Sequence, residues 1–149
     1  MALKIGVGKF QSTKLLIAGM EIEKVDMKRI LIIDDEEDIR EIAQLSLEEL
    51  GGWEVITAES GIEGLAKAKI EQPDAILLDI TMPDMDGFST WLGLRTNPET
   101  VHIPVIFVTA KAQTINWSRC AELGMNAVIA KPFDPMTLAE RVAEILDWN

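Results

Sequence analysis

The chain has 149 residues, of which 48% are hydrophobic and 26% charged, which fits one globular domain and excludes an intrinsically disordered protein. Its net charge of −11 argues against direct binding to DNA or RNA, whose phosphates an acidic domain repels. The single cysteine, Cys120, excludes an internal disulfide, and the apolar stretch Leu15–Met20 is too short to span a bilayer. We therefore expect a cytoplasmic protein that binds neither membrane nor nucleic acid.

Residues 1–27 differ from the rest of the chain in charge. Four lysines against three acidic residues give this segment a net charge of +1, so the remaining residues carry −12. We expect residues 1–27 to be an N-terminal extension that is poorly ordered or translated from an upstream start codon, and residues 28–149 to form the folded domain. The alternative is that Lys14–Met20 adds a strand or contacts a partner.

From Arg29 onward, short apolar runs alternate with amphipathic helical patterns. The apolar runs predict five strands, at Ile30–Ile33, Trp53–Ala58, Ala75–Leu78, Pro104–Val108 and Ala127–Ala130. The first predicted helix has an apolar face of Ile39, Ile42, Ala43, Ser46 and Leu50, and further helices are predicted at about 61–71, 88–96, 113–123 and 135–146. Capping signals support these boundaries, notably Ser60 with Glu63 and the pair Asp134-Pro135.

The alternation of strands and helices predicts the fold class. Continuous apolar strands indicate a parallel sheet with helices on both faces. Right-handed crossovers leave few topologies, and we expect the doubly wound strand order 2-1-3-4-5. The fold is therefore α/β, a flavodoxin-like three-layer sandwich around a five-stranded parallel sheet. The carboxyl ends of its strands line one edge, where such folds bind their ligands.

Polar residues with complementary chemistry stand at these strand ends, namely Asp34, Asp35, Asp79, Thr109 and Lys131. Three ionised carboxylates repel one another unless a cation joins them, and Mg²⁺ fits because it prefers oxygen ligands and phosphate. The Asp79 carboxylate can attack phosphorus to form an acyl phosphate, while the Lys131 amine and the Thr109 hydroxyl can contact phosphoryl oxygens. The sequence thus predicts a magnesium-assisted phosphoryl site. The Lys131–Pro132 bond is a candidate cis peptide.

Four motifs together carry a resemblance to a known family. They are Asp34-Asp35, the loop Asp-Ile-Thr-Met-Pro-Asp-Met-Asp-Gly from Asp79 to Gly87, the pair Thr109-Ala110, and Lys131-Pro132-Phe133. Each motif alone is weak evidence, but their order and their positions at matching strand ends are highly specific. Over about Arg29 to Trp148 the chain resembles the receiver domain of two-component response regulators, of the single-domain type.

The resemblance implies a phosphorelay function with assigned residues. Asp79 would accept a phosphoryl group from a phosphohistidine on a sensor histidine kinase or a phosphotransfer protein. Asp35 and Asp79 would bind Mg²⁺ directly together with the backbone carbonyl of Thr81, and Asp34 would act mostly through water. Receiver domains also accept small acyl phosphates and slowly hydrolyse their own acyl phosphate. Self-catalysed transfer, and not the activity of a dedicated enzyme, is therefore expected.

The resemblance also implies a switch. Phosphorylation adds about −1.5 to −2 charge beside the metal. Thr109 and Lys131 would then move inward and reshape the surface of the fourth helix, the last strand and the last helix. A downstream protein would bind this surface, because no output domain is expected after Trp148. The chain departs from the family at Val128, where members often carry an aromatic residue whose rotamer follows the threonine hydroxyl.

Three other functions agree with parts of the sequence but explain it less well. A receiver-like interaction module that no longer uses phosphate agrees with Val128 but leaves the complete set of five site residues unexplained. A flavodoxin-type electron carrier needs a Ser/Thr/Gly-rich loop after the first strand, where residues 34–38 are all acidic. A phosphatase with an Asp-x-Asp motif fits poorly, because Ile80-Thr81 follow Asp79.

Overall fold

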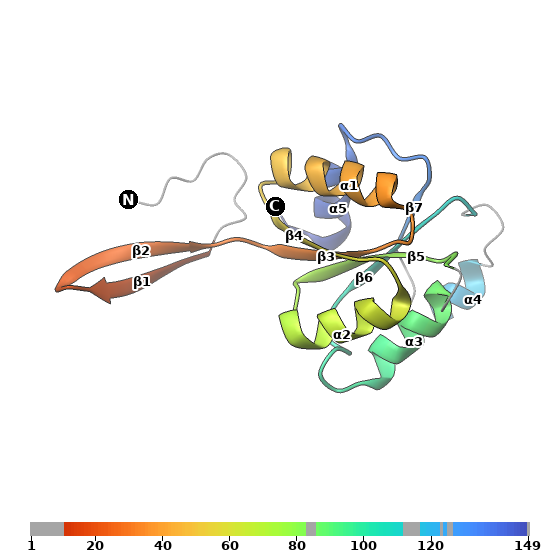
Figure 1. Cartoon of the computed structure of the whole chain (residues 1–149), viewed down its shortest axis with the longest axis horizontal. Coiled ribbons are helices and arrows are strands. Elements are labelled where there is room, and N and C mark those ends of the chain that lie inside the picture. The colour runs from red at the N-terminus through yellow and green to blue at the C-terminus, as the bar shows by residue number, and fades with distance from the viewer. Residues whose placement is uncertain (1–10, 83–85, 112–116, 123, 125–126, 149) are drawn as a thin grey trace.

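The computed structural model describes residues 11–82, 86–111, 117–122, 124 and 127–148. Its elements appear in Figure 1 in the chain order β1 (Gln11–Ile17), β2 (Met20–Asp26), β3 (Arg29–Ile33), α1 (Glu37–Glu49), β4 (Glu54–Ala58), α2 (Gly61–Glu71), β5 (Ala75–Asp79), α3 (Gly87–Thr96), β6 (Val105–Thr109), α4 (Trp117–Glu122), β7 (Val128–Ala130) and α5 (Leu138–Leu146). Among the described residues, no helix combines the length and the apolar character needed to cross a membrane.

The main sheet has five parallel strands in the order β4-β3-β5-β6-β7. Counted within this sheet, the order is 2-1-3-4-5, so the predicted doubly wound topology is confirmed. Helices α1 and α5 cover one face and α2 and α3 cover the other, which gives the three-layer sandwich (Figure 1). The strand order reverses between β3 and β5, so the loops that follow these two paired strands lead to opposite faces of the sheet and leave a crevice at the carboxyl ends, where ligands bind in such folds.

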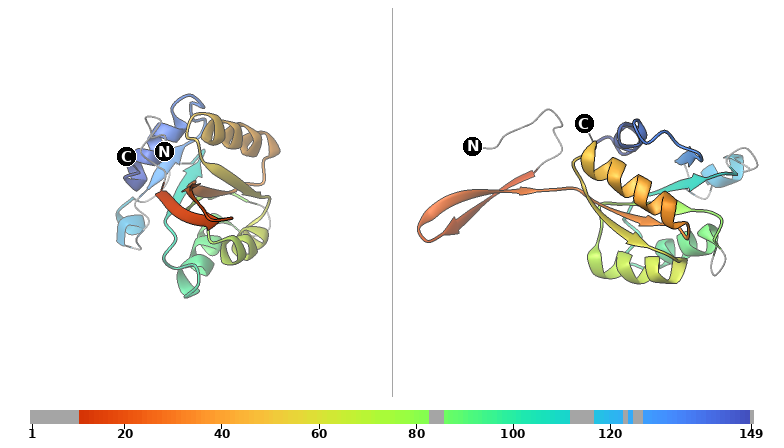
Figure 2. Two further views of the ribbon diagram at one scale, coloured as in Figure 1. Left: turned by 90° about the vertical axis from the view of Figure 1, so that its left-hand side faces the viewer. Right: turned by 45° about the horizontal axis from the view of Figure 1, so that its top comes forward.

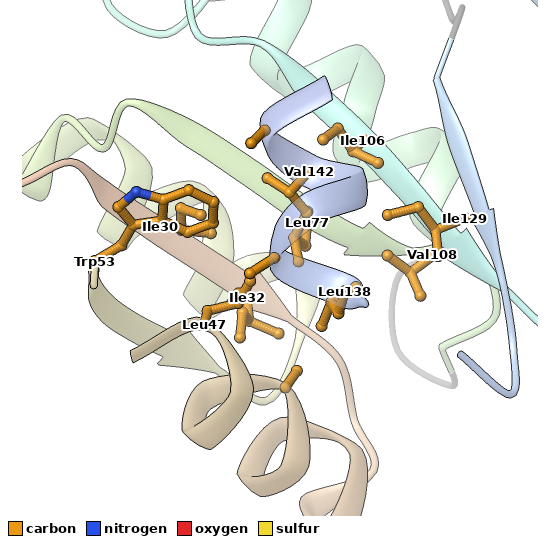
Figure 3. Packing of buried hydrophobic residues seen from close by; sticks show 13 residues of the cluster. Ile30, Ile32, Leu47, Trp53, Leu77, Ile106, Val108, Ile129, Leu138 and Val142 are labelled. Atoms are coloured by element: carbon orange, nitrogen blue, oxygen red, sulfur yellow. The ribbon is translucent and has the colours of Figure 1, made fainter. Parts of the chain in front are cut away.

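Alternating strand residues build a separate core on each face of the sheet. On the α1 and α5 side, Ile32, Leu77 and Val108 pack against Leu47 and Leu138 (Figure 3). The opposite core contains Ile33, Leu78 and Phe107, which neighbour these residues along their strands, together with buried residues of α2 and α3. Burying a side chain of this size is worth roughly 1.5–3 kcal/mol. The two cores therefore fix the strand ends from both sides.

Two helices differ from their predicted form. In α1 the buried residues are Ala43, Ser46 and Leu47, whereas Ile42 and Leu50 are 44% and 48% exposed. The predicted apolar face is therefore confirmed at Ala43 and Ser46 and wrong at Ile42 and Leu50, because the face of α1 that packs against α5 carries Ala43 and Leu47. Helix α5 begins at Leu138, after a turn in which the Asp134 carboxylate accepts a hydrogen bond from the Met136 amide at 2.9 Å.

The fourth predicted helix is described only in part. Helix α4 comprises Trp117–Glu122, and residues 113–116 and 123 of the prediction lie outside the described residues. Met85, which belongs to the quoted loop motif, also lies outside them.

Residues 11–26 form an antiparallel hairpin, although the sequence favoured an extension that is poorly ordered or translated from an upstream start codon, with an added strand at Lys14–Met20 as the alternative. Ile17 pairs with Met20, and Ala18 and Gly19 between them have φ angles of 52° and 78°. A two-residue turn with both φ angles positive matches the twist of an antiparallel pair. The hairpin projects away from the domain (Figure 2). The division of the chain at residue 27 remains a prediction.

Candidate functional site

The carboxyl edge of the sheet gathers the five residues singled out from the sequence. Asp34 follows β3, Asp79 ends β5, Thr109 ends β6 and Lys131 follows β7. Asp34, Asp79 and Thr109 are only 2%, 4% and 0% exposed, whereas Asp35 is exposed. Buried polar groups of this kind are costly unless each is paired. Their grouping at one edge therefore calls for an explanation beyond folding.

Three carboxylates lie close enough to bind one cation. Asp34, Asp35 and Asp79 each offer a carboxylate oxygen, and these oxygens lie within 4.8 Å of one another. Oxygen donors at this spacing suit a hard divalent cation such as Mg²⁺. The Thr81 amide donates a hydrogen bond to Asp79 Oδ1 at 3.2 Å, which holds the start of the following loop against the cluster.

Lys131 supplies the positive charge of the site. Its side chain is 8% exposed, and Nζ lies 2.6 Å from Asp34 Oδ2, 3.4 Å from Glu36 Oε1 and 3.5 Å from Asp79 Oδ2. Burial by itself lowers the pKa of Lys131, but its hydrogen bond to Asp34 and the surrounding negative charges raise that pKa above its ordinary value. The amine is therefore charged at neutral pH, and one ammonium group serves three carboxylates.

The Asp79 carboxyl is the group most affected by this surplus of negative charge. Burial raises the pKa of Asp79 from 3.8 to about 6, and Asp34 and Asp35 add to the rise against the opposing effects of Lys131 and the Thr81 amide. The positive charge of Lys131 does not fully offset the negative charges of Asp79 and the carboxylates beside it. A cation beside it would restore the balance and lower the pKa of Asp79 again.

Thr109 connects the site to the chain on both sides of it. Its hydroxyl oxygen accepts a hydrogen bond from the Lys111 amide at 3.0 Å, and its carbonyl accepts one from the Lys131 amide at 2.8 Å. Since no acceptor for the hydroxyl proton is found among the described residues, this proton can be donated to a group in the cleft. The Lys131–Pro132 peptide bond is cis, as the sequence analysis allowed.

Gly87 is a site residue whose role sequence reasoning missed. A Cβ added at Gly87 would lie 2.4 Å from the carbonyl oxygen of Asp79 and 2.5 Å from the Cα of Ile80. The Gly87 amide also donates to the Ile80 carbonyl at 2.7 Å. Only glycine allows the start of α3 to approach the end of β5 this closely. The signal was present in the sequence as Asp86-Gly87, where Asp86 caps α3 through the Ser89 amide at 2.7 Å.

Two further contacts were also missed. Glu36 adds a partly exposed carboxylate near Lys131, and its amide donates to Asp34 Oδ1 at 2.9 Å. Arg40 donates from Nη1 to the backbone carbonyl of Asp34 at 2.7 Å. Both residues belong to an acidic-rich stretch that reads, from sequence alone, as the ordinary start of a helix.

Comparisons with known proteins agree with this geometry. The family model for the response regulator receiver domain matches residues 30–143. The chain is 40% identical over 119 residues to the alkaline phosphatase synthesis transcriptional regulatory protein PhoP of Bacillus subtilis, which covers 80% of this chain and 48% of that protein. It is 38% identical over 120 residues to the DNA-binding dual master transcriptional regulator RpaA of Synechocystis, covering 80% and 49%. The chain thus spans about half the length of these relatives.

Solved structures give the same result. A putative response regulator from Chloroflexus aurantiacus aligns with a TM-score of 0.73 and 34% identity, over 82% of this chain and 99% of that one. A CheY-like receiver domain protein from Methanospirillum hungatei aligns with a TM-score of 0.70 and 36% identity, over 82% and 95%. These matches favour the receiver architecture over the flavin carrier and the phosphatase that the sequence analysis considered.

Proposed function

Because the chain belongs to the response regulator receiver domain family, we propose that it accepts a phosphoryl group on Asp79 and thereby switches a protein-binding surface. The donor would be a phosphohistidine on a sensor histidine kinase or phosphotransfer protein, with Mg²⁺ as cofactor, in the cytoplasm. The observation that carries this proposal is the buried Asp79 carboxylate, which lies between two other carboxylates and the Lys131 amine. A structural ion pair does not require carboxylates that are buried beside one another.

The transfer would use Asp79 as the nucleophile. An Asp79 carboxylate oxygen forms a bond to phosphorus as the phosphorus–nitrogen bond of the phosphohistidine breaks, and the electron pair stays on the imidazole. We assign Asp35, Asp79 and the Thr81 carbonyl as direct ligands of Mg²⁺, with Asp34 acting through water. When bound, Mg²⁺ would supply the positive charge that lets the carboxylates and the phosphoryl oxygens approach one another.

Lys131 and Thr109 would respond to the new group. The ammonium of Lys131 is bonded to Asp34 at 2.6 Å before the reaction and has Asp79 within 3.5 Å, so a small movement brings it to phosphoryl oxygens. The Thr109 hydroxyl would donate to another phosphoryl oxygen. Since the Lys111 amide is bonded to that hydroxyl, the segment after β6 would follow it.

The backbone would carry the signal to the surface of α4, β7 and α5, where a downstream protein would bind. The aromatic relay common in the family is absent, because Val128 stands at the start of β7. The Lys131 amide is bonded to the Thr109 carbonyl, so a shift of Thr109 reaches the end of β7 directly. Direct contact with nucleic acid is not part of the proposal, since residues 28–149 carry a charge of −12.

Val128 also keeps a second function open, a receiver-like module that binds its partner without phosphate. The two are separated by mixing the protein with acetyl phosphate and Mg²⁺ and measuring its intact mass, beside Asp79→Asn. The phosphoacceptor proposal predicts one phosphoryl adduct on the wild type, none on Asp79→Asn, and none on the wild type in EDTA. If no sample carries an adduct, although a separate titration shows that the wild type binds Mg²⁺, the phosphate-independent module would be favoured.

A further inference from the structure

Arg40 is a nearly buried cation in a position that disfavours positive charge. It is the fourth residue of α1, and its side chain is 12% exposed. The amino-terminal end of a helix favours anions, and Glu37 and Asp38 in the same turn follow that rule. Arginine at this place therefore needs specific partners to offset the cost.

Its partners lie in the loops that follow β3 and β4, and the first of these loops carries Asp34 and Asp35 of the acidic cluster. Nη1 donates to the Asp34 carbonyl at 2.7 Å, and Nη2 lies 3.6 Å from Glu59 Oε1. The amide of Asp34 donates in turn to the Ala58 carbonyl at 3.1 Å. Both backbone groups of Asp34 are thus held, one by α1 and the other by β4.

Asp35, the next residue, depends on this backbone for its position. Its carboxylate is exposed, and among the described residues no side-chain hydrogen bond fixes it. On its other side, Glu36 is held by the bond from its amide to Asp34 Oδ1 at 2.9 Å. The position of the Asp35 carboxylate beside Asp79 therefore follows from how firmly Asp34 is fixed.

We infer that Arg40 is a positioning residue of the cation site: by holding the Asp34 carbonyl, it keeps the Asp35 carboxylate facing Asp79 so that a divalent cation can bind between them. The inference rests on the proposed function for the use of the cation. Arg40 itself touches neither cation nor phosphoryl group in this account.

Replacing Arg40 tests the inference, because a positioning role and a purely electrostatic role predict changes of opposite sign in the affinity for Mg²⁺. Removing a positive charge near three carboxylates strengthens cation binding by simple electrostatics. Removing a positioning residue weakens it, because outer-shell partners of metal ligands typically contribute about 10–100-fold in affinity. The two roles therefore predict opposite changes.

The experiment compares Arg40→Ala and Arg40→Lys with wild type by isothermal titration with MgCl₂ alone. Arg95→Ala on the last turn of α3 is the matched control for loss of an arginine away from the cluster. We expect Arg40→Ala to weaken Mg²⁺ binding by about tenfold, Arg40→Lys to recover part of that loss through its remaining donor, and Arg95→Ala to behave as wild type.

A second measurement uses the metal-free protein and does not depend on the proposed function. Amide hydrogen exchange at Glu36 reports the bond to Asp34, and we expect it to become faster in Arg40→Ala with little change in the strands of the sheet. An unchanged exchange rate at Glu36 in a folded variant overturns the inference, as does tighter Mg²⁺ binding. Wild type that binds no Mg²⁺ would instead count against the proposed function, and the exchange rate would still decide the role of Arg40.

Discussion

The two ends of the β3 strand use the same types of charged residue in opposite ways. At its amino end, Arg29 lies 2.7 Å from Glu71 and 3.4 Å from Glu54, and its amide donates to Asp74. These side chains are all partly exposed, with 56% exposure for Glu54 and 41% for Glu71. At the carboxyl end, buried Asp34 and Asp79 compete for one amine, and the pKa of Asp79 rises to about 6.

The difference separates a structural charge network from a reactive one. In the Arg29 network, one guanidinium with several donors meets acceptors that water also solvates, so the charges are satisfied without any further ligand. Carboxylates outnumber the cation at both ends of β3, but Asp34 and Asp79 are buried, so only the site around Asp79 gains stability from a further cation. A substitution at the amino end of β3 should therefore change only stability, whereas a substitution at the carboxyl end should also change the rate of phosphorylation.

Replacing Lys131 should have the largest effect. We expect Lys131→Ala to reduce the rate of adduct formation with acetyl phosphate and saturating Mg²⁺ by roughly 100-fold, because a positioned charge on the transferred group is lost. The measurement is intact mass against time, with the exposed Lys69→Ala as control. A rate within twofold of wild type would show that Lys131 only neutralises the acidic cluster.

Gly87→Ala should disturb both the fold and the site. The new Cβ would lie 2.4 Å from the Asp79 carbonyl oxygen, a backbone atom that cannot rotate away. We expect the free energy of unfolding in urea to fall by about 1–3 kcal/mol, the usual cost of overpacking, with slower phosphorylation of the folded fraction. Gly19→Ala in the hairpin turn is an unsuitable control because of its positive φ, so Ser89→Ala at the start of α3 serves instead. Stability equal to wild type would contradict the close packing at Gly87.

The pKa of Asp79 predicts a pH-dependent gain in stability for Asp79→Asn. Since folding raises this pKa from 3.8 to about 6, the folded protein binds a proton between these values, and its free energy of unfolding falls as pH rises through that window. In metal-free buffer at pH 7, we expect Asp79→Asn to be more stable than wild type by roughly 1–3 kcal/mol. The advantage should shrink towards pH 4 and on addition of Mg²⁺. Equal stability at pH 7 would contradict the excess of negative charge at the site.

Arg29→Ala should have the smallest effect, and only on stability. Its ion pairs are partly exposed, and exposed pairs contribute about 0–1 kcal/mol. We expect a loss of about 1 kcal/mol in urea unfolding and an unchanged rate of phosphorylation at saturating Mg²⁺. A slower phosphorylation rate would mean that the two ends of β3 are coupled and that the Arg29 network is not purely structural.

The strands, and the grouping of the five candidate residues at one edge of the sheet, could be predicted because their signals are local. A continuous apolar run such as Ala75–Leu78 indicates a buried strand wherever it occurs, and a polar residue that follows it must lie at the carboxyl edge. Parallel pairing then brings residues 97 positions apart, such as Lys131 and Asp34, to within hydrogen-bonding distance. The distances themselves, and the sharing of one amine among three carboxylates, could not be read from the sequence.

The missed features depend on packing between elements. Ile42 reads as apolar and was placed inside, but α5 covers a different face of α1, with the Ser46 hydroxyl bonded to the Pro135 carbonyl. Arg40 matters through its contact with the backbone carbonyl of Asp34, which leaves no pattern in the chain, whereas Gly87 matters through its close approach to the Asp79 carbonyl, for which Asp86-Gly87 is a sequence signal. The hairpin turn at Ala18-Gly19 also lacks a strong local signal, because Ala18 has a positive φ that alanine rarely adopts.

The most direct measurement is to locate the phosphoryl group. The protein, phosphorylated with acetyl phosphate and Mg²⁺, is treated with borohydride, which reduces an acyl phosphate to an alcohol, and its peptides are sequenced by mass spectrometry. Phosphorylation on Asp79 predicts homoserine at position 79 and intact aspartate at positions 34 and 35. Homoserine at 34 or 35, or unreduced aspartate at all three positions in a protein that carries the adduct, would contradict the assignment of Asp79 as the phosphoacceptor.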